Sequence, residues 1–486
     1  MQGYTLHTIA ILILIYFIYW IKPFSKIKIQ NLLLLIASYS CFAFVNWRFL
    51  IVVICITLIN LIVGKVISTC KSGHIRKLFL ILNIIFHIGL LGFFRYFNFF
   101  VEDVIKYLSF LNIDSSWNSL NIIVPLGISI YTLQALSYSI DIYRKKIEPA
   151  KDIVAFFAYV SFFPQMIAGP IERASTFLPQ FYRERQLNID DIRKGSKRIL
   201  WGLFKKLVIA NNLAVYANEI FRNFNDYSGF TVFAGLVAFA FQLYADLSGF
   251  SDIAIGIARL FGFTINTNFR IPYFSKNFSD FWSRWNISLM YWIKDYIYNP
   301  MGGSEGKPWV VFRNLFILFF LFGLWHGGNI SFVLFGFVNA IILLPSALKP
   351  ETGNNNYFSR KKILNNIESF IRFLITGFIV IVGLTFFRSG SSADGVNILK
   401  NLFTNVFSIS INELRSLGNG LVATISNVVI LFIYVVIEEF QRKSEFALDF
   451  DNTRISTNKG HLITILVLIL LLFYYEINQE LIYFNY

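Results

Sequence analysis

Charged residues are scarce in this sequence, since Asp, Glu, Lys and Arg make up 15% of its 486 residues, against about 25% in an average soluble domain. Apolar residues make up 56% and aromatic residues 18%, with 55 phenylalanines. A water-soluble globule of this size could not bury so much apolar surface. The composition also excludes a disordered chain and a small disulfide scaffold. The sequence therefore predicts an integral membrane protein with many spans.

Residues that often carry enzyme chemistry are few as well. There are three cysteines, with no pair at metal-ligand or redox spacing, and five histidines. The sequence has no H-E-x-x-H, no G-x-G-x-x-G and no phosphate-binding loop, and the nucleophile-elbow pattern G-x-S-x-G fails at Ile253, two residues after Ser251. We therefore expect no metal site and no bound cofactor.

The distribution of basic residues argues against nucleic acid as a partner. The net charge is +15, but Lys and Arg stand in short clusters between apolar runs rather than in one stripe. These clusters lie at 22–28, 71–77, 144–146, 183–198 and 360–362. Such clusters are typical of cytoplasmic loops. They predict a first span that starts outside the cytoplasm and is retained, with residues 22–28, 65–77 and 144–146 inside.

Apolar stretches predict the membrane spans. They lie near 6–21, 31–45, 49–64, 78–100, 122–140, 229–247, 315–325, 330–348, 371–387, 421–437 and 462–475. Two more, 153–170 and 207–221, contain prolines or polar residues, which is typical of re-entrant or protein-buried segments. The expected fold is an all-α polytopic membrane protein with about 11–13 transmembrane helices plus re-entrant or interfacial helices. We expect N-terminal transmembrane helices over 1–121, a central core over 122–348 and C-terminal transmembrane helices over 349–486, all within one membrane domain.

Residues 263–309 break this pattern, because they are rich in aromatic and charged residues and contain no span. Aromatic residues between Asp280 and Pro300 recur at spacings of three and four, which predicts an amphipathic helix at membrane depth or at the interface, ended by Pro300 and the Gly302–Gly303 turn. On this pattern alone, an interfacial anchor is the more common interpretation.

His326 differs from the other four histidines, because it lies between two apolar runs and precedes Gly327 and Gly328. His87 also lies in an apolar run, where we expect a packed or hydrogen-bonded side chain. An ionisable group at membrane depth is a functional hypothesis by default. A neutral imidazole suits a general base, and the glycines would let a substrate approach the backbone. A histidine that caps a helix end in a tight turn is the equal alternative.

Carboxylates gather at four positions beside aromatic or small residues, namely Asp246, Asp252, Asp280 and Asp295. Proton carriers are one interpretation. Helix caps and ion pairs with Arg259, Arg270 or Arg284 are the more common outcome for buried charge.

Six sequence blocks stand in a fixed order along the chain. They are PLGISIYTLQALSYSIDIYR at 125–144, FFPQMIAGPIERASTFLPQF at 162–181, GLFKKLVIAN at 202–211, YADLSGFSDIAIGIARLFGF at 244–263, NFRIPYFSKNFSDFWSRWNISLMYWIKDYIYNPMGG at 268–303 and LWHGGNISFVLFGFVNA at 324–340. In these blocks the chain resembles the membrane-bound O-acyltransferases, and within them the bacterial alginate O-acetyltransferase branch. The resemblance implies a core with a central tunnel that joins a cytoplasmic donor to an acceptor on the other side.

The resemblance also implies site residues. His326 matches the histidine regarded as catalytic, and Asn286 matches a second active-site residue, commonly His in the bacterial branch and Asn or Asp elsewhere. That branch often has a further His where this sequence has Asn339. With the segment 263–309 reinterpreted as an active-site wall, we expect substrate or tunnel roles for Trp282, Arg284, Trp285, Asp295, Trp325, Asp246 and Ser251.

The function implied is O-acyl transfer. An acetyl group would move from a cytoplasmic thioester, with acetyl-CoA as the expected donor, for O-acetylation of an extracellular polysaccharide. Membrane lipids, the glycan and a separate extracytoplasmic acetyltransferase are the expected partners, and a bacterial cytoplasmic (inner) membrane is the expected location. D-alanyl transfer to teichoic acid from a carrier-protein thioester and a non-enzymatic transporter or flippase remain alternatives.

Overall fold

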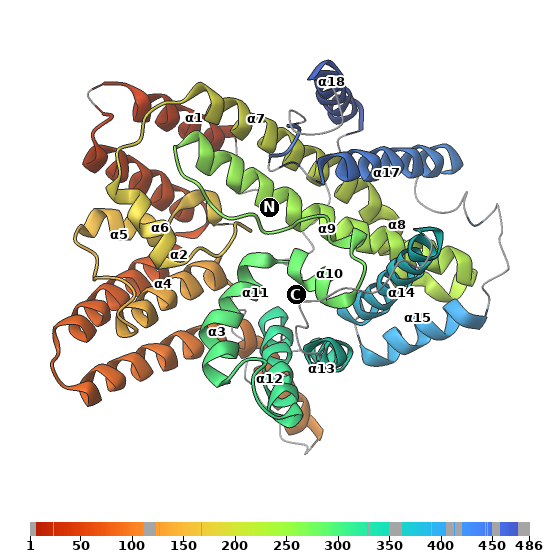
Figure 1. Ribbon diagram of the computed structural model, residues 1–486, viewed down its shortest axis with the longest axis horizontal. Helices are drawn as coiled ribbons and strands as arrows, with labels where there is room; N and C mark the ends of the chain where they lie inside the picture. Colours follow the sequence, from red (N-terminus) through yellow and green to blue (C-terminus); the bar gives the residue numbers. More distant parts are fainter. Residues whose placement is uncertain are drawn as a thin grey trace. The chain divides into compact units, whose positions relative to one another are not determined.

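The computed structural model of the chain is built from helices and the loops between them (Figure 1). It describes residues 6–22, 24–110, 123–125, 127–166, 168–327, 330–348, 362–389, 391–404, 413, 420–442, 444, 446–449 and 457–474. No β-strand occurs among these residues. The predicted all-α class is therefore confirmed.

The chain forms two compact units. The first comprises Met1–Ser196 and Ala254–Asn266, and the second comprises Lys197–Ile253 and Thr267–Tyr486. Two of the three boundaries fall inside helices, α7 (Ile189–Leu203) and α9 (Gly229–Leu260), so each of these helices contributes to both units, and the third lies between Asn266 and Thr267. The three-part division expected from the sequence stays a prediction.

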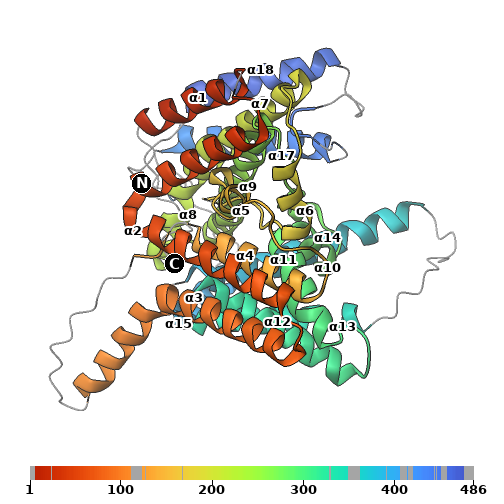
Figure 2. The same ribbon diagram turned by 90° about the vertical axis from the view of Figure 1, so that its left-hand side faces the viewer.

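The first unit is a helical bundle. Its helices are α1 (Leu6–Trp20), α2 (Ile27–Thr69), α3 (Gly73–Phe110), α4 (Ile128–Tyr143), α5 (Ile153–Val160) and α6 (Ala174–Phe177), with 3₁₀ turns at Phe163–Gln165 and Leu178–Tyr182. Figure 2 shows α2, α3 and α4 beside one another. The two spans expected at 31–45 and 49–64 are halves of α2, joined at Asn46, where the backbone is extended (φ −167°, ψ 119°).

A buried polar cluster joins α2, α3 and α4. The Asn60 amide donates to Nε2 of His87 over 2.8 Å. Oδ1 of Asn60 accepts hydrogen bonds from Asn83 at 3.0 Å and Ser139 at 2.8 Å. All four side chains are buried. The expectation of a hydrogen-bonded His87 is confirmed, and the cluster fixes the mutual register of three apolar helices, because each buried polar group needs its partner.

Glu172 makes a second polar contact inside the first unit, in the loop before α6. Its carboxylate is buried and accepts hydrogen bonds from the main-chain N of Asn266 at 2.6 Å and from its Nδ2 at 2.8 Å. Burial raises the pKa of the Glu172 carboxyl to about 7, although the two hydrogen bonds and the charge of Arg173 oppose that shift. This carboxyl therefore gains or loses its proton near neutral pH.

The second unit contains the remaining helices. They are α8 (Asn211–Asn223), α10 (Phe278–Arg284), α11 (Ile287–Ile293), α12 (Pro308–His326), α13 (Ile330–Ala347), α14 (Lys362–Arg388), α15 (Ser392–Thr404), α17 (Leu421–Gln441) and α18 (Thr457–Tyr474), with π-helical stretches at Phe204–Ala210 and Lys294–Tyr298 and 3₁₀ turns at Phe224–Asp226, Pro272–Phe274 and Asn299–Met301. In Figures 1 and 2, α12 and α13 lie side by side.

The basic segment 183–198 was expected in a cytoplasmic loop, and two of its arginines are buried in the protein and make polar or ring contacts there. Arg185 is buried, donates to Oδ1 of Asn31 at 2.7 Å and lies over the ring of Phe263. Arg198 is buried and pairs with Asp252 at 2.9 Å. The sequence could not show this, because hydropathy does not reveal which distant side chains neutralise a charge.

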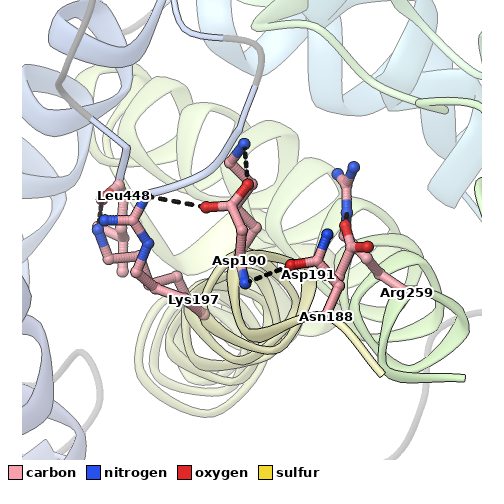
Figure 3. Close-up of polar contacts among 8 residues, drawn as sticks. Asn188, Asp190, Asp191, Lys197, Arg259 and Leu448 are labelled. Carbon is pink, nitrogen blue, oxygen red and sulfur yellow. Dashed lines mark hydrogen bonds and ion pairs between the residues drawn. The ribbon is translucent and has the colours of Figure 1, made fainter. Parts of the chain in front are cut away.

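The rest of this segment forms the start of α7, whose polar contacts appear in Figure 3. Asn188 caps the helix by accepting from the main-chain N of Asp190 at 2.9 Å. Within the first unit, Asp191 pairs with Arg259 of α9 at 2.8 Å. Within the second unit, Lys197 donates to the carbonyl oxygen of Leu448 at 3.0 Å. These contacts hold α7 to segments distant in sequence.

Seven helices of the described chain are long and apolar enough to cross a membrane. They are the stretches Ile27–Thr69, Gly73–Phe97, Ile189–Asp226, Gly229–Leu260, Pro308–His326, Glu368–Arg388 and Leu421–Gln441, and four shorter apolar helices lie at Ile11–Trp20, Ile153–Gln165, Ser331–Pro345 and Lys459–Tyr474. This is a multi-pass membrane protein. The span expected at 122–140 differs, because α4 starts at Ile128 and is buried by protein along nearly its whole length.

Candidate active site

The segment rich in aromatic residues folds as broken helices within the second unit. In place of one amphipathic helix, α10 and α11 are followed by the π-helical stretch Lys294–Tyr298, and the chain then turns at Gly302 and Gly303, both at positive φ. The expected end at this turn is confirmed. Most aromatic side chains here are buried, for example Trp282 and Trp285 at 5% and 6% exposure. The interpretation as an interfacial anchor is therefore wrong, because protein and not lipid surrounds these rings.

Trp285 is the centre of a stack of aromatic rings. Phe281 lies parallel to it with centroids 5.5 Å apart, and Phe269 meets it edge-on at 5.3 Å. Tyr273 contacts Phe281 and Trp285 at 6.2 Å from each. Rings in such offset and edge-on contacts form a rigid wall, since they bury large areas with few rotatable bonds.

Asn286 lies at the bend between α10 and α11, directly after this wall. Its backbone is left-handed, with φ 43° and ψ 51°. On either side of the bend, the main-chain N of Arg270 donates to the carbonyl oxygen of Arg284 and the N of Ile287 donates to that of Asn268. A non-glycine residue held at positive φ marks a position where surrounding structure overrides local preference.

His326 is the last residue of α12 and is enclosed by aromatic rings. Its ring centroid lies 4.7 Å from Phe322, 4.8 Å from Trp325 and 4.9 Å from Phe387 of α14. The imidazole itself is half-buried. The histidine therefore does end a helix, as in the capping alternative, and its ring also lies in an apolar enclosure suited to a neutral base.

Gly327 has a different role from the one expected. A Cβ at this position would lie 2.7 Å from the ring of Phe332, so this ring occupies the space beside the glycine. The absent side chain lets α13 approach α12, and it does not leave room for a substrate there. Gly328 lies outside the described residues.

Trp282 links the wall to the surroundings of His326. Its ring contacts Phe322 at 5.1 Å and Phe335 at 6.4 Å, and both of these rings also contact His326. Its indole N–H donates to Oδ1 of Asn339 on α13. Trp282, Trp325 and His326 are thus brought together as the sequence led us to expect.

A small apolar hollow adjoins this cluster. It is lined by residues of α10, α13 and α14 together with Trp285, among them Trp282, Trp285, Phe335, Asn339, Val380 and Gly383. Asn339 supplies the polar side chain in this lining. The hollow is therefore suited to an apolar group.

The charged residues expected near the site form ion pairs. Arg284 pairs with Asp280 at 2.7 Å, as expected. Asp246 pairs with Lys206 at 2.6 Å, and Asp252 pairs with Arg198 and with Lys205. All three partners of Asp246 and Asp252 differ from the arginines that the sequence led us to expect. These ion pairs form because α7 and α9 pack closely enough for the side chains to meet. A Cβ on Gly202 would lie 2.6 Å from the carbonyl oxygen of Gly249.

Two remaining predicted residues lie in other parts of this unit. Ser251 is buried on α9, one residue before Asp252, and Asp295 is half-buried in the π-helical stretch after α11. Phe387 and Asn268 were missed. Asn268 opens one of the sequence blocks, whereas Phe387 lies 61 positions from His326 with no motif around it. In the part of the chain that the structure describes, no three His, Cys, Asp or Glu side chains gather as a metal site.

Comparison with known proteins gives a family match and several relatives. Residues 149–386 match the model of the MBOAT, membrane-bound O-acyltransferase family. The chain is 32% identical to the probable alginate O-acetylase AlgI of Pseudomonas aeruginosa over 414 residues, which cover 85% of this chain and 76% of that protein. It is 33% identical to the peptidoglycan O-acetyltransferase of Helicobacter pylori over 402 residues, covering 76% of this chain and 73% of that protein. It is also 26% identical to the teichoic acid D-alanyltransferase of Bacillus subtilis over 241 residues, covering 46% and 59%.

The chain is a helical membrane protein in which a histidine lies among aromatic rings at the end of an apolar helix. The chain belongs to the membrane-bound O-acyltransferase family. It is an O-acyltransferase, and its reaction uses an acyl donor.

Proposed function

We propose that this protein moves an acetyl group from a cytoplasmic thioester, acetyl-CoA, for O-acetylation of an extracellular polysaccharide. The observation that carries the proposal is the position of His326 in its enclosure of Phe322, Trp325 and Phe387. The relatives from P. aeruginosa and H. pylori, a probable alginate O-acetylase and a peptidoglycan O-acetyltransferase, support an acetyl group and a glycan acceptor. The bacterial cytoplasmic membrane is the location that this route requires.

In the proposed reaction His326 acts as the general base. The imidazole takes the proton of an acceptor hydroxyl while that oxygen attacks the thioester carbonyl. The new C–O bond forms, the C–S bond breaks, and the imidazolium returns its proton to the departing thiolate. Because a thiolate is a good leaving group, the direct transfer requires no nucleophile from the enzyme.

Asn286 has a supporting role in this mechanism. Its amide is polar but does not titrate, so it orients substrate or donates a hydrogen bond to charge that develops on the carbonyl oxygen. Trp282, Trp285 and Trp325 form the apolar wall that excludes water. The acceptor hydroxyl belongs either to the glycan or to a separate extracytoplasmic acetyltransferase that passes the acetyl group on.

The decisive experiment measures ester-linked acetate on the surface polymer of cells that lack the chromosomal gene and produce either the wild-type protein or His326→Ala. The wild-type protein should restore acetate that mild alkali releases, and His326→Ala should not, at equal amounts of protein in the membrane. Acetate retained with His326→Ala would refute the role of this residue. Asn286→Ala should lose part of the activity.

A second candidate function is D-alanyl transfer from a carrier-protein thioester, favoured by the similarity to the B. subtilis enzyme. The identity of the acyl donor distinguishes acetyl transfer from D-alanyl transfer. In membrane vesicles supplied with radiolabelled acetyl-CoA, our proposal predicts labelled polymer, whereas D-alanyl transfer predicts label only from an aminoacylated carrier. A transporter or flippase predicts no acyl transfer from either donor.

A further inference from the structure

We propose that Asn268 is a positioning residue that holds Asn286 in its left-handed conformation and so aims the Asn286 side chain at the reacting groups. This inference rests on the proposed function, in which Asn286 takes part. It concerns the second unit alone, where both residues lie.

Asn268 binds the two residues that follow Asn286. Its carbonyl oxygen accepts from the main-chain N of Ile287 at 2.8 Å. Its side-chain Oδ1 accepts from the main-chain N of Ser288 at 3.1 Å and from the Ser288 hydroxyl at 2.9 Å. Asn268 and Ser288 are both buried. One residue from outside α11 thus satisfies the N–H groups of its first two residues, which have no partner within the helix.

The residue that would ordinarily do this is the N-cap itself. In most helices the N-cap residue has an extended backbone, and its side chain bonds to the second or third N–H of the helix. Asn286 is the N-cap of α11, but its backbone is left-handed and its side chain makes no capping hydrogen bond. Asn268 takes over the capping, and the amide of Asn286 is left available for another purpose.

The same contacts account for the conformation of Asn286. Left-handed backbone is uncommon for a non-glycine residue, and although Asn adopts it more readily than most, the contacts on either side decide whether it is kept. Asn268 fixes residues 287 and 288 on one side of the bend, and the hydrogen bond between Arg270 and Arg284 fixes the other side. Because the backbone is held on both sides of the bend, the side chain of Asn286 points in one direction.

The test compares three substitutions at Asn268 in the polymer-acetate assay. Asn268→Leu removes the side-chain acceptor and should lower acetylation about ten- to hundredfold, the scale of a misplaced catalytic geometry. Asn268→Asp keeps an acceptor oxygen for both donor groups of Ser288 and should retain most of the acetylation. If the leucine variant does not accumulate in the membrane, Asn268→Ser replaces it under the same criteria.

Asn277 supplies the matched control. Its side chain caps α10 by accepting from the main-chain N of Asp280 at 2.8 Å, and it lies nine positions before Asn286. Asn277→Leu removes an equivalent cap from a helix of equal length without touching residues 286–288. It should retain acetylation near the wild-type level.

A double variant separates positioning from general stability. In an Asn286→Gly background the backbone tolerates positive φ and no side chain remains to be aimed. Asn268→Leu should therefore add no further loss, whereas a structural defect would multiply the two losses. Wild-type activity of Asn268→Leu, failure of Asn268→Asp to rescue, or multiplied losses would each overturn this inference. Acetylation that persists with His326→Ala would instead overturn the proposed function itself.

Discussion

The indole Nε1 of Trp282 donates a hydrogen bond to Oδ1 of Asn339 over 3.2 Å and so joins α10 to α13. Asn339 in turn donates from Nδ2 to the carbonyl oxygen of Phe335 at 2.6 Å, and both side chains are buried. Because Phe335 also contacts His326, this pair connects the aromatic wall with the surroundings of the histidine.

Replacing Asn339 by Leu should destabilise the protein. The substitution leaves a buried indole N–H without an acceptor, which costs about 1–3 kcal/mol. The midpoint of thermal unfolding in detergent should fall. Adding Trp282→Phe, which removes the indole N–H that has lost its acceptor, should recover part of the lost stability. Strictly additive losses would show that the two side chains do not interact.

His326→Gln should abolish acetylation, because the amide keeps polarity and approximate size but cannot take a proton at neutral pH. The control is His461→Gln, on α18, whose side chain is exposed. Both variants should accumulate in the membrane like the wild-type protein. Equal acetylation by the two variants would contradict a role for His326 as base.

Asp252→Asn should be among the most destabilising single substitutions in the second unit. It removes the carboxylate that pairs with Arg198 and Lys205, both buried, and an uncompensated buried charge costs about 3–5 kcal/mol. Glu368→Gln breaks an exposed pair with Arg372 and should cost about 1 kcal/mol or less. Thermal unfolding in detergent measures both, and similar midpoints would contradict the prediction.

The raised pKa of Glu172 predicts that the stability of the folded protein depends on pH. Its pKa is raised from 4.5 to about 7, so the folded protein retains a proton that the unfolded chain has lost. The stability that this proton contributes is complete below pH 4.5 and is lost as the pH rises through about 7.

Glu172→Gln removes this dependence. The variant should resemble the wild-type protein at pH 4.5 and exceed it above pH 7, by as much as about 3 kcal/mol for a shift of this size. The measurement is the unfolding midpoint from pH 4.5 to 8.5. Parallel pH profiles for the two proteins would show that Glu172 does not carry the effect.

The sequence predicted most of the spans well, because hydropathy is a local property that can be read along one segment. The stretches 229–247 and 421–437 lie within α9 and α17 as expected. At α4 the helix begins at Ile128, later than the expected span 122–140, and protein encloses its apolar run. Apolar residues leave water equally well into lipid or into a protein core, so hydropathy cannot distinguish the two.

Asn286 shows, within the candidate site, the same difference between what the sequence predicts and what the tertiary structure decides. The resemblance implied Asn, Asp or His at this position, and these are the non-glycine residues enriched at positive φ. The left-handed conformation gives a physical reason for that choice. We infer that this conformation depends on the hydrogen bonds that Asn268, 18 positions earlier, accepts from Ile287 and Ser288, which no local pattern encodes.

By itself the sequence determined the membrane class and the family, and it singled out His326 as the candidate base, since each of these depends on composition or on contiguous blocks. The tertiary structure decided which carboxylate meets which cation, which ring of α14 encloses His326 and which asparagine caps α11. Those outcomes depend on helices distant in sequence that pack within a few ångströms of one another, as Gly202 and Gly249 allow. Buried polar groups then bond to whatever partner that packing brings within reach.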